Sequence, residues 1–495
     1  MRHKLIGAIL LCIAPLLLFA QYKNNIWLLG YANNFSGAPW NGSKLVFNPT
    51  GIDTSYDERS MVLGGCYSGL SSTDDSWFVY TNGSAVCNKN NDTLVNGFDL
   101  SPGGDDNWRV LGMNIAFASV IFPAQNYGSF LYLLHQNKKG GSPAVRTLQL
   151  YYSKIDPTAA GGGNVYLKNQ VLIDDTIEIG GLVPCRHANG RDWWILVRKF
   201  NSNQYYTILA TPNEISVKFI QTLPEPITFL GGQRNFSPNG EYFASFDNAS
   251  QLRIYDFDRC TGILSNFRYK YITPLTAGAL SFSPNSRFLY VSKMDTLWQF
   301  DMQAPDVLNS QTFIGTYDGF IDTLLGFGNG FWYHWNGPDG KIYMSATSTS
   351  RVLHVINNPD FAGQACNFQQ HAVYFPTFNN GTTPTYANLN LFEVPNSVCD
   401  SLDVGIDELS NGNKELKIMP NPSDGNFSIE FKALNTSGTV YIYDVNGTLV
   451  YREYVSPFTT IKNINLQNVL SNGLYAVSLV RVNERALGKL IVKKE

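Results

Sequence analysis

The chain has 495 residues and a formal net charge of −3, and only 15% of its residues are charged while 14% are aromatic. A mildly acidic balance without a basic block argues against partners such as nucleic acid or an anionic membrane surface. This length predicts more than one domain. Because 43 glycines and 23 prolines supply many turns and helical periodicity is scarce, the fold class is expected to be all-β.

The first twenty residues are typical of a secretory signal peptide. Arg2 and Lys4 precede an apolar run over residues 5–19, which ends at Ala20 before a polar segment. A basic head, an apolar core of this length and a small boundary residue are the features of such a signal. The run is short for a membrane span, and no other segment approaches that length. We expect a signal peptide over 1–20 and no transmembrane segment after its removal.

A phrase that joins a turn to a β-strand recurs in the middle of the chain. Its clearest copies begin with the turns at 236–240, 282–286 and 337–340. In these turns proline fixes the first corner, asparagine or aspartate tolerates the second, and glycine suits a left-handed exit. A strand of alternating aromatic and β-branched residues follows each turn, and a repeat of about 40–50 residues with several short strands is typical of one propeller blade.

Weaker copies of the phrase lie at 72–76, 126–129 and 187–192, which brings the number of units to six. Two strand-like segments remain, at 26–29 and 387–392. Propellers commonly close the ring by completing one blade from both chain ends, so these segments are expected to make a seventh blade. We therefore predict a seven-bladed β-propeller over 21–395, within a range of six to eight blades.

The repeated phrase resembles the WD-repeat-like repeats of exported bacterial propellers. The longer stretches 187–194 and 363–368 are similar to secreted propellers that carry a type IX sorting domain. This resemblance covers most of the chain but implies no activity.

A polar segment without pattern at 396–415 predicts a linker, and the strand signal resumes over 416–495. Short alternating strands with regular turns predict a small Ig-like β-sandwich there. This tail resembles the type A C-terminal sorting domain of the type IX (Por) secretion system, and the matching residues are Pro420, Asn421, Pro422, Gly425, Phe427, Gly447, Gly473, Tyr475 and Lys489.

The resemblance of the tail implies a route and partners. Cargo with such a tail passes the periplasm, crosses the outer membrane through the type IX secretion machinery, and is attached to the cell surface or released after its sortase removes the tail. We expect the cut in the linker 396–415. An ordinary adhesive Ig-like module is the alternative, because a fold alone does not fix function.

Six cysteines remain after the signal peptide, and an exported chain permits disulfides between them. We predict a local bridge between Cys66 and Cys87, which flank a predicted strand turn, and a second bridge between Cys366 and Cys399. The alternative is that several are buried free thiols.

Local motifs give little sign of catalysis. The chain lacks a nucleophile elbow, a His-Glu-x-x-His motif, a phosphate-binding loop and EF-hand spacing, and its histidines are too scattered for a metal site. No cofactor is therefore expected. Aromatic side chains are weak candidates for a ligand-binding rim, although the space between blades is the other place for them. These candidates are Trp40, Trp108, Trp332 and Trp335.

The leading hypothesis is a non-enzymatic secreted propeller that binds a glycan or a protein. The alternative is a propeller hydrolase acting on glycans or peptides, with catalytic groups gathered from several blades. Three or more carboxylates, arginines or histidines at the mouth of the channel would favour the hydrolase, and an uncharged aromatic rim would favour binding. A scaffold part of the secretion or gliding apparatus is a third possibility.

Overall fold

The structure is a computed structural model, and its chain divides into two compact units, Met1–Ser401 and Leu402–Glu495. The structure describes residues 22–32, 39–102, 112–113, 115–124, 130–137, 147–226, 231–274, 276–379, 381–394, 397, 399, 416–431, 438–445, 449–481 and 484–494.

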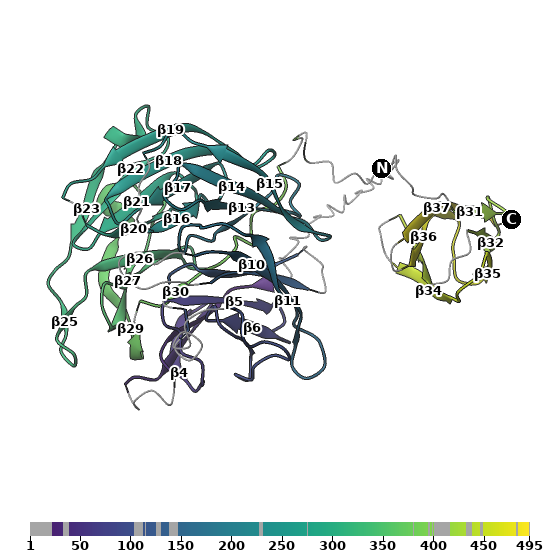
Figure 1. Cartoon of the computed structure of the whole chain (residues 1–495), viewed down its shortest axis with the longest axis horizontal. Helices are drawn as coiled ribbons and strands as arrows, with labels where there is room; N and C mark the ends of the chain where they lie inside the picture. Colours follow the sequence, from purple (N-terminus) through teal and green to yellow (C-terminus); the bar gives the residue numbers. More distant parts are fainter. Residues whose placement is uncertain are drawn as a thin grey trace, which may run out of the picture. The chain divides into compact units, whose positions relative to one another are not determined.

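Seven sheets form the ring of the first unit in its described residues, and we number them as blades in chain order (Figure 1). Blade 1 holds β2 (Ile26–Gly30), β3 (Gly42–Asn48) and β4 (Gly51–Asp57). Blade 2 holds β5 (Cys66–Ser72), β6 (Phe78–Thr81) and β7 (Val86–Asn88), and blade 3 holds β8 (Ser119–Pro123), β9 (Leu131–Gln136), β10 (Leu150–Asp156) and β11 (Asn164–Ile173). Blade 4 holds β12 (Pro184–Arg186), β13 (Trp193–Arg198), β14 (Gln204–Ala210) and β15 (Ile215–Thr222).

The remaining blades have four strands each. Blade 5 holds β16 (Gln233–Phe236), β17 (Tyr242–Phe246), β18 (Gln251–Asp258) and β19 (Ile263–Tyr271), and blade 6 holds β20 (Gly278–Phe282), β21 (Phe288–Lys293), β22 (Thr296–Asp301) and β23 (Thr312–Thr316). Blade 7 holds β26 (Phe331–Asn336), β27 (Ile342–Ala346), β28 (Ser350–Ile356) and β29 (Phe368–Asn379). Between strands lie η1 (Val307–Asn309), η2 (Gly363–Cys366) and the hairpin β24 (Ile321–Asp322) with β25 (Phe327–Gly328).

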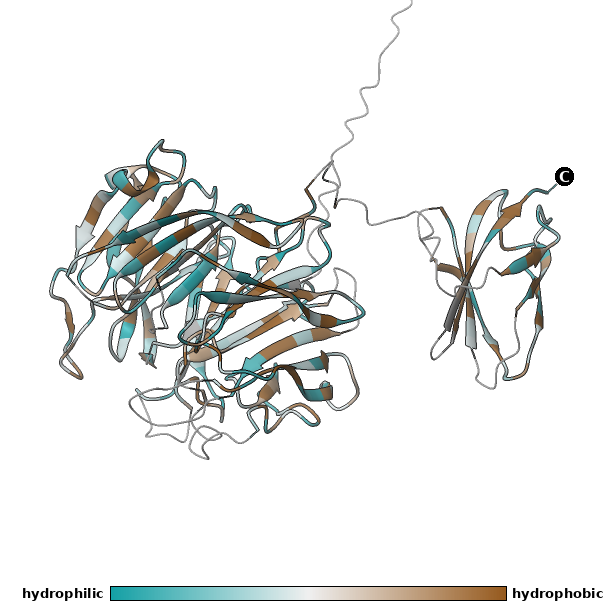
Figure 2. Cartoon of the chain, turned by 45° about the horizontal axis from the view of Figure 1, so that its top comes forward, coloured by the Kyte–Doolittle hydropathy of each residue, from teal (hydrophilic) through white to brown (hydrophobic). Residues whose placement is uncertain are grey.

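Buried apolar cores between neighbouring blades close these sheets into a ring. Alternating strand residues fill these cores, and Figure 2 shows brown and teal alternating along many strands. Trp27 of blade 1 packs with Trp335 of blade 7, while Leu28 on the opposite face of the same strand packs with Tyr67 of blade 2. Further cores join blades 2 to 4, 4 to 5, 5 to 6 and 6 to 7. The predicted seven-bladed propeller is confirmed.

The predicted turn phrase is the connection between the first two strands of a blade. The fourth turn residue donates its N–H to the carbonyl of the first, as from Gly240 to Ser237 and from Gly190 to His187. Gly240 has φ +74° and Gly340 has φ +76°, the left-handed region that favours glycine.

Both ends of the propeller chain complete blade 2, and this differs from the predicted closure. β1 (Tyr22–Lys23) pairs antiparallel with β5, and β30 (Thr383–Pro384) pairs with the same strand in parallel. The prediction that 26–29 and 387–392 share a blade is wrong, since 26–29 belong to blade 1 and 387–392 form no strand.

Residues 385–394, which we call the strap, run from blade 2 to blades 4 and 5. Thr385 donates its backbone N–H to the carbonyl of Tyr67 in blade 2, and Val394 donates to Ala188 in the turn of blade 4, at 2.8 Å each. Ala387, Leu389 and Leu391 alternate as in a strand and are buried. They fill cores between blades 2 to 5 instead of facing a sheet partner, which explains the strand-like pattern.

The cysteine pairing differs from both predictions. Cys260, between β18 and β19, is bonded to Cys399, with 5.6 Å between their Cα atoms. β6 lies between the strands of Cys66 and Cys87, so these residues are two strand spacings apart, beyond disulfide reach. Cys366 is buried between blades 6 and 7, away from Cys399. Cys66, Cys87, Cys185 and Cys366 are buried free thiols, which confirms the alternative.

The second unit is a β-sandwich, as predicted. One sheet holds β31 (Lys417–Met419), β32 (Asn426–Glu430) and β35 (Ile461–Asn465), and the other holds β33 (Gly438–Tyr443), β34 (Leu449–Val455), β36 (Gly473–Arg481) and β37 (Glu484–Val492). Its core includes Phe427, Ile442 and Val477. Among the helices within the described ranges, none is long and apolar enough to cross a membrane.

Candidate functional site: a cavity at the mouth of the channel

The first strands of the blades surround the centre of the ring, because β16 contacts β20, β20 contacts β26, and β5 contacts β8. A cavity of about 770 Å³ lies at the end of this channel on the side of the turns between first and second strands. Its wall comprises parts of blades 4 to 7, residues 23–25, Phe117, Pro384 and residues 385–391 of the strap. This volume is within the range of sites for small ligands.

Uncharged amides dominate the polar part of the wall. Eight asparagines line the cavity, namely Asn24, Asn25, Asn235, Asn239, Asn285, Asn336, Asn388 and Asn390. Lys23 is the one charged side chain among the lining residues, and its Nζ lies 2.6 Å from Asp75 Oδ2. Phe117, Phe236 and Tyr386 supply apolar surface.

Several amides tie the blades together below the mouth. Gln233 of blade 5 donates to the carbonyl of His334 in blade 7 at 2.6 Å and accepts the N–H of the same residue at 3.1 Å. Asn235 and Asn336 donate to carbonyls of the intervening blade 6, at 3.3 and 2.9 Å. The floor of the cavity is therefore braced across three blades.

Five lining residues carry a buried polar atom that has no hydrogen-bond partner among the residues the structure describes. The atoms are Asn25 Oδ1, His334 Nδ1, Trp335 Nε1, Thr385 Oγ1 and the hydroxyl oxygen of Tyr386. His334, Trp335 and Thr385 are themselves almost fully buried. An unpaired buried polar atom costs about 1–3 kcal/mol, so native proteins rarely keep several in one place.

His334 is neutral. Its Nε2 lies 2.7 Å from Ser292 Oγ, and burial lowers the pKa of its imidazole to about 3. A neutral imidazole presents one donor and one acceptor nitrogen.

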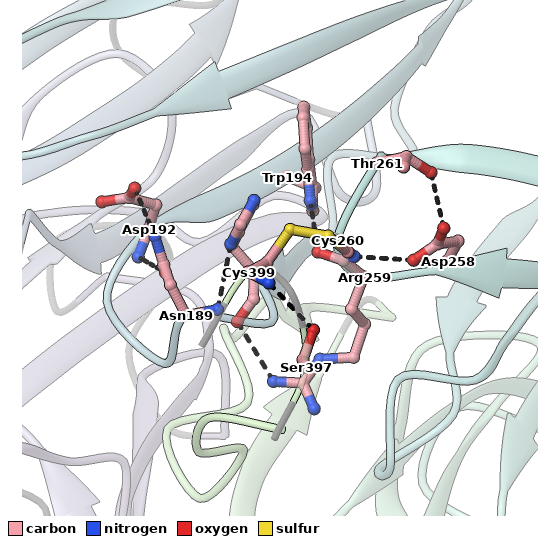
Figure 3. The surroundings of a disulfide bond; sticks show 10 residues. Asn189, Asp192, Trp194, Asp258, Arg259, Cys260, Thr261, Ser397 and Cys399 are labelled. Carbon is pink, nitrogen blue, oxygen red and sulfur yellow. Dashed lines mark hydrogen bonds between the residues drawn. A yellow bond between two sulfur atoms is a disulfide. The ribbon is translucent and has the colours of Figure 1, made fainter. Parts of the chain in front are cut away.

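The far end of the strap is hydrogen-bonded to blade 5, and Figure 3 shows Arg259 beside the disulfide between Cys260 and Cys399, which lies beyond the strap in the chain. Asn388 donates to the carbonyl of Pro238 at 2.8 Å, and Arg259 donates to the carbonyl of Phe392. Arg259 also donates from Nε to Arg186 at 2.9 Å, and the next residue forms the disulfide to Cys399. The strap is thus a fixed wall of the cavity.

Of the predicted rim tryptophans, the structure describes Trp40, Trp332 and Trp335, and all three are buried or half-buried. Trp335 is 5% exposed and packs edge-on against Trp27, so placing it on an exposed rim is wrong, although it lines the cavity. Trp332 is half-buried, and Trp40 is half-buried against Phe378. Trp108 lies outside the described residues.

Among the residues with unpaired atoms, sequence reasoning singles out Trp335 and misses Asn25, His334, Thr385 and Tyr386. Asn25 and Thr385 come from opposite ends of the propeller chain, and no local motif joins them. The density of asparagine in the strap, at Asn388 and Asn390, is the one signal that the sequence offers.

The motif residues of the tail are mainly structural. Phe427 and Tyr475 are buried, and Asn421 accepts the N–H of Ile491 at 2.8 Å and donates to the carbonyl of Lys489 at 2.5 Å. The peptide bonds before Pro420 and Pro422 are cis. Gly425 has φ +106° with the backbone of Gln467 close by, and Gly473 begins β36, while Gly447 lies outside the described residues.

Residues 417–493 match the family model of the secretion system C-terminal sorting domain. The second unit is a type IX sorting domain. Such a domain implies secretion to the cell surface or outside, which confirms the predicted route and an interaction with the type IX machinery. No curated protein matches the chain.

Solved structures similar to the chain include surface and periplasmic proteins. PorZ, described as an essential bacterial surface component of the type IX secretion system of Porphyromonas gingivalis, is 12% identical with a TM-score of 0.34, covering 92% of this chain. The chain spans only 63% of that PorZ chain. The periplasmic gluconolactonase of Pseudomonas aeruginosa is 12% identical, with a TM-score of 0.41 and 72% and 98% of the two chains covered. The β-propeller domain of Cps50 (Swd1) from Myceliophteria thermophila is 8% identical, with a TM-score of 0.36 and 65% and 90% covered. These similarities are too low to indicate an activity.

Proposed function

We propose that this secreted propeller is a binding module without catalytic activity, and that a glycan or protein ligand enters the cavity at the mouth of the channel. The observation that supports this most is the wall of the cavity, where neutral amides and apolar side chains meet without a carboxylate or an arginine among the lining residues. Hydrolysis of glycans or peptides generally needs converging titratable groups or an activated nucleophile.

A cavity-filling variant of the full secreted chain tests this proposal. Asn390 lines the cavity and is exposed, so Asn390→Trp adds bulk there without disturbing a core. Asn213 is an exposed turn residue of blade 4 that does not line the cavity, and Asn213→Trp is the matched control.

The three proteins are incubated with immobilised glycans and with proteins from the bacterial surface. We expect the wild type and Asn213→Trp to retain a ligand that Asn390→Trp loses. Capture of nothing by the wild type contradicts the proposal. Release of cleaved sugars or peptides supports the hydrolase instead.

A further inference from the structure

The four-stranded sheet of the sorting domain turns one face toward the core of the sandwich and the other away from it. Val440 and Ile442 of β33 are buried in that core, as are Val477 and Leu479 of β36. Because side chains alternate along a strand, the residues between them point outward. We call these outward positions of β33, β34, β36 and β37 the outer face.

Apolar side chains dominate the outer face. Tyr454 is 59% exposed, and the other largely exposed apolar residues of this face are Leu449, Leu474, Val480 and Ile491. Tyr441 and Tyr443 are half-buried, and their rings stack with 6.3 Å between the centroids. A sheet face in contact with water usually carries polar side chains, so this face differs from an ordinary free surface.

Strand pairing makes these side chains contiguous. Thr439 of β33 lies between Tyr454 of β34 and Val480 of β36. Leu474 of β36 is paired with Ile491 of β37. Directly paired residues on one face of a sheet are in contact, so the apolar surface crosses all four strands.

The charged side chains of the outer face are cations. Arg452 of β34 and Lys489 of β37 are exposed, and neither forms an ion pair with a carboxylate in the described part of the domain. The outward positions of the four strands, where the structure describes them, hold no aspartate or glutamate. The two arms of positive charge therefore lie beside apolar surface without a counter-charge of their own.

The outward positions of the three-stranded sheet are different. Ser428 donates its hydroxyl to Asn463 at 2.7 Å, and Lys417 forms an ion pair with Glu430 at 3.2 Å. The exposed apolar residues on this side are Met419 and Ile461. This sheet largely satisfies its own polar groups, so the outer face has the stronger need of a partner.

We propose that the outer face is the surface by which the sorting domain docks on the type IX secretion machinery, against a part of that machinery that is apolar and carries carboxylates. The family of the domain supplies the partner, and Arg452 and Lys489 supply the charge that its surface must complement. Contiguous apolar surface rimmed by charge is typical of protein interfaces, in which tyrosine is enriched. The proposed docking surface lies in the second unit alone and does not depend on the ligand of the propeller.

Two pairs of variants of the full chain provide a matched test. Tyr454 on the outer face and Ile461 on the other sheet are 59% and 55% exposed, so Tyr454→Ser and Ile461→Ser each remove one exposed apolar side chain. Arg452→Glu and Lys417→Glu each reverse one exposed cation, on the outer face and on the other sheet.

The chains are produced in a bacterium with a type IX system, and the ratio of exported to periplasmic protein is measured. We expect Tyr454→Ser and Arg452→Glu each to lower this ratio by about 3- to 10-fold, because each weakens docking. Ile461→Ser and Lys417→Glu should leave the ratio unchanged. Limited proteolysis of the purified full chains checks that the second unit stays folded, and Arg452→Glu decides the outcome if Tyr454→Ser does not fold.

Three results would overturn the proposal. Unchanged export of both outer-face variants, or equal losses in the two pairs, would show that the outer face is not the docking surface. A loss for Tyr454→Ser without a loss for Arg452→Glu would remove the carboxylates from the partner. Self-association of the purified wild type that Tyr454→Ser abolishes, with export unchanged, would make the outer face a contact between copies of this chain.

Discussion

Cys399 is bonded to Cys260 across a sequence separation of 139 residues, and the bond joins the chain just beyond the strap to blade 5. The strap is one wall of the cavity, and its other end is hydrogen-bonded to blade 2. The disulfide therefore helps to hold in place the strap, which is one wall of the cavity at the mouth of the channel.

Removal of this disulfide should destabilise the propeller. A disulfide that closes a loop of this length lowers the conformational entropy of the unfolded chain. This should stabilise the folded propeller by about 3–5 kcal/mol. We expect Cys399→Ser to unfold at lower denaturant than the oxidised wild type, as measured by tryptophan fluorescence. Under reducing conditions the two proteins should unfold together. Equal midpoints of the oxidised wild type and the variant would contradict this.

The disulfide also determines which cuts release the sorting domain. A protease site placed just before Cys399 leaves the tail joined to blade 5 through sulfur, whereas a site placed after Cys399 frees it. On a non-reducing gel we expect the first cut protein to keep its full mass and the second to lose the tail. Reduction should make both lose it. Release of the tail by the first cut without reductant would show that the bond does not form.

Glu225 should be important for stability because it is a fully buried carboxylate between two arginines. Its oxygens lie 2.9 Å from Arg198 Nε and 3.3 Å from Arg253 Nε. Glu225→Ala leaves these buried charges with less compensation and should lower the free energy of unfolding by about 3–5 kcal/mol. Asp301→Ala breaks the partly exposed pair with Arg287 and should lower the free energy of unfolding by less than about 1 kcal/mol. Similar losses for both variants in denaturant unfolding would refute the contrast.

Acid should destabilise the propeller through its buried histidines. Burial lowers the pKa of His135 to about 3 and that of His354 to about 4, as it does for His334, from an ordinary value of 6.5. The unfolded chain binds these protons near pH 6.5, and the folded protein does not. The contribution of these neutral histidines to the free energy of unfolding is therefore fully present above pH 6.5. It is lost as pH falls toward 4, by up to about 1.4 kcal/mol per pH unit for each histidine.

Unfolding in urea at several pH values measures this slope. His135 Nε2 lies 3.1 Å from Ser153 Oγ, and glutamine at this position keeps a polar partner without titrating. The slope of the unfolding free energy against pH gives the number of protons taken up on unfolding. We expect His135→Gln to reduce that number by about one between pH 6.5 and 4. An unchanged slope would mean that His135 is protonated in the folded state.

Local chemistry in the sequence was enough to predict the blades. A turn with proline at its first corner needs a residue in the left-handed conformation at its end, and the structure has Gly240 and Gly340 in that conformation. The alternation over 387–392 was also real, but it reports only that one face is buried. Crevices between blades cover that face, and a single sequence does not distinguish them from a neighbouring strand.

The cavity and the disulfide could not be predicted in the same way. Both join residues that are far apart in the chain and meet only when the ring closes, such as Asn25 with Thr385 and Cys260 with Cys399. The predicted pairing of Cys66 with Cys87 relied on proximity in sequence, and the intervening strand keeps them apart.

Because of the position of Cys399 in the chain, the oxidation state of this cysteine indicates whether the propeller has folded. This cysteine follows the last strand of the seventh blade, and its partner lies in the fifth blade, so every blade precedes it in the chain. The sulfur atoms reach each other when the ring is complete and the strap lies in place. In an oxidising periplasm the bond would therefore mark molecules that finished folding before export, and free thiols at these two positions would identify those that had not.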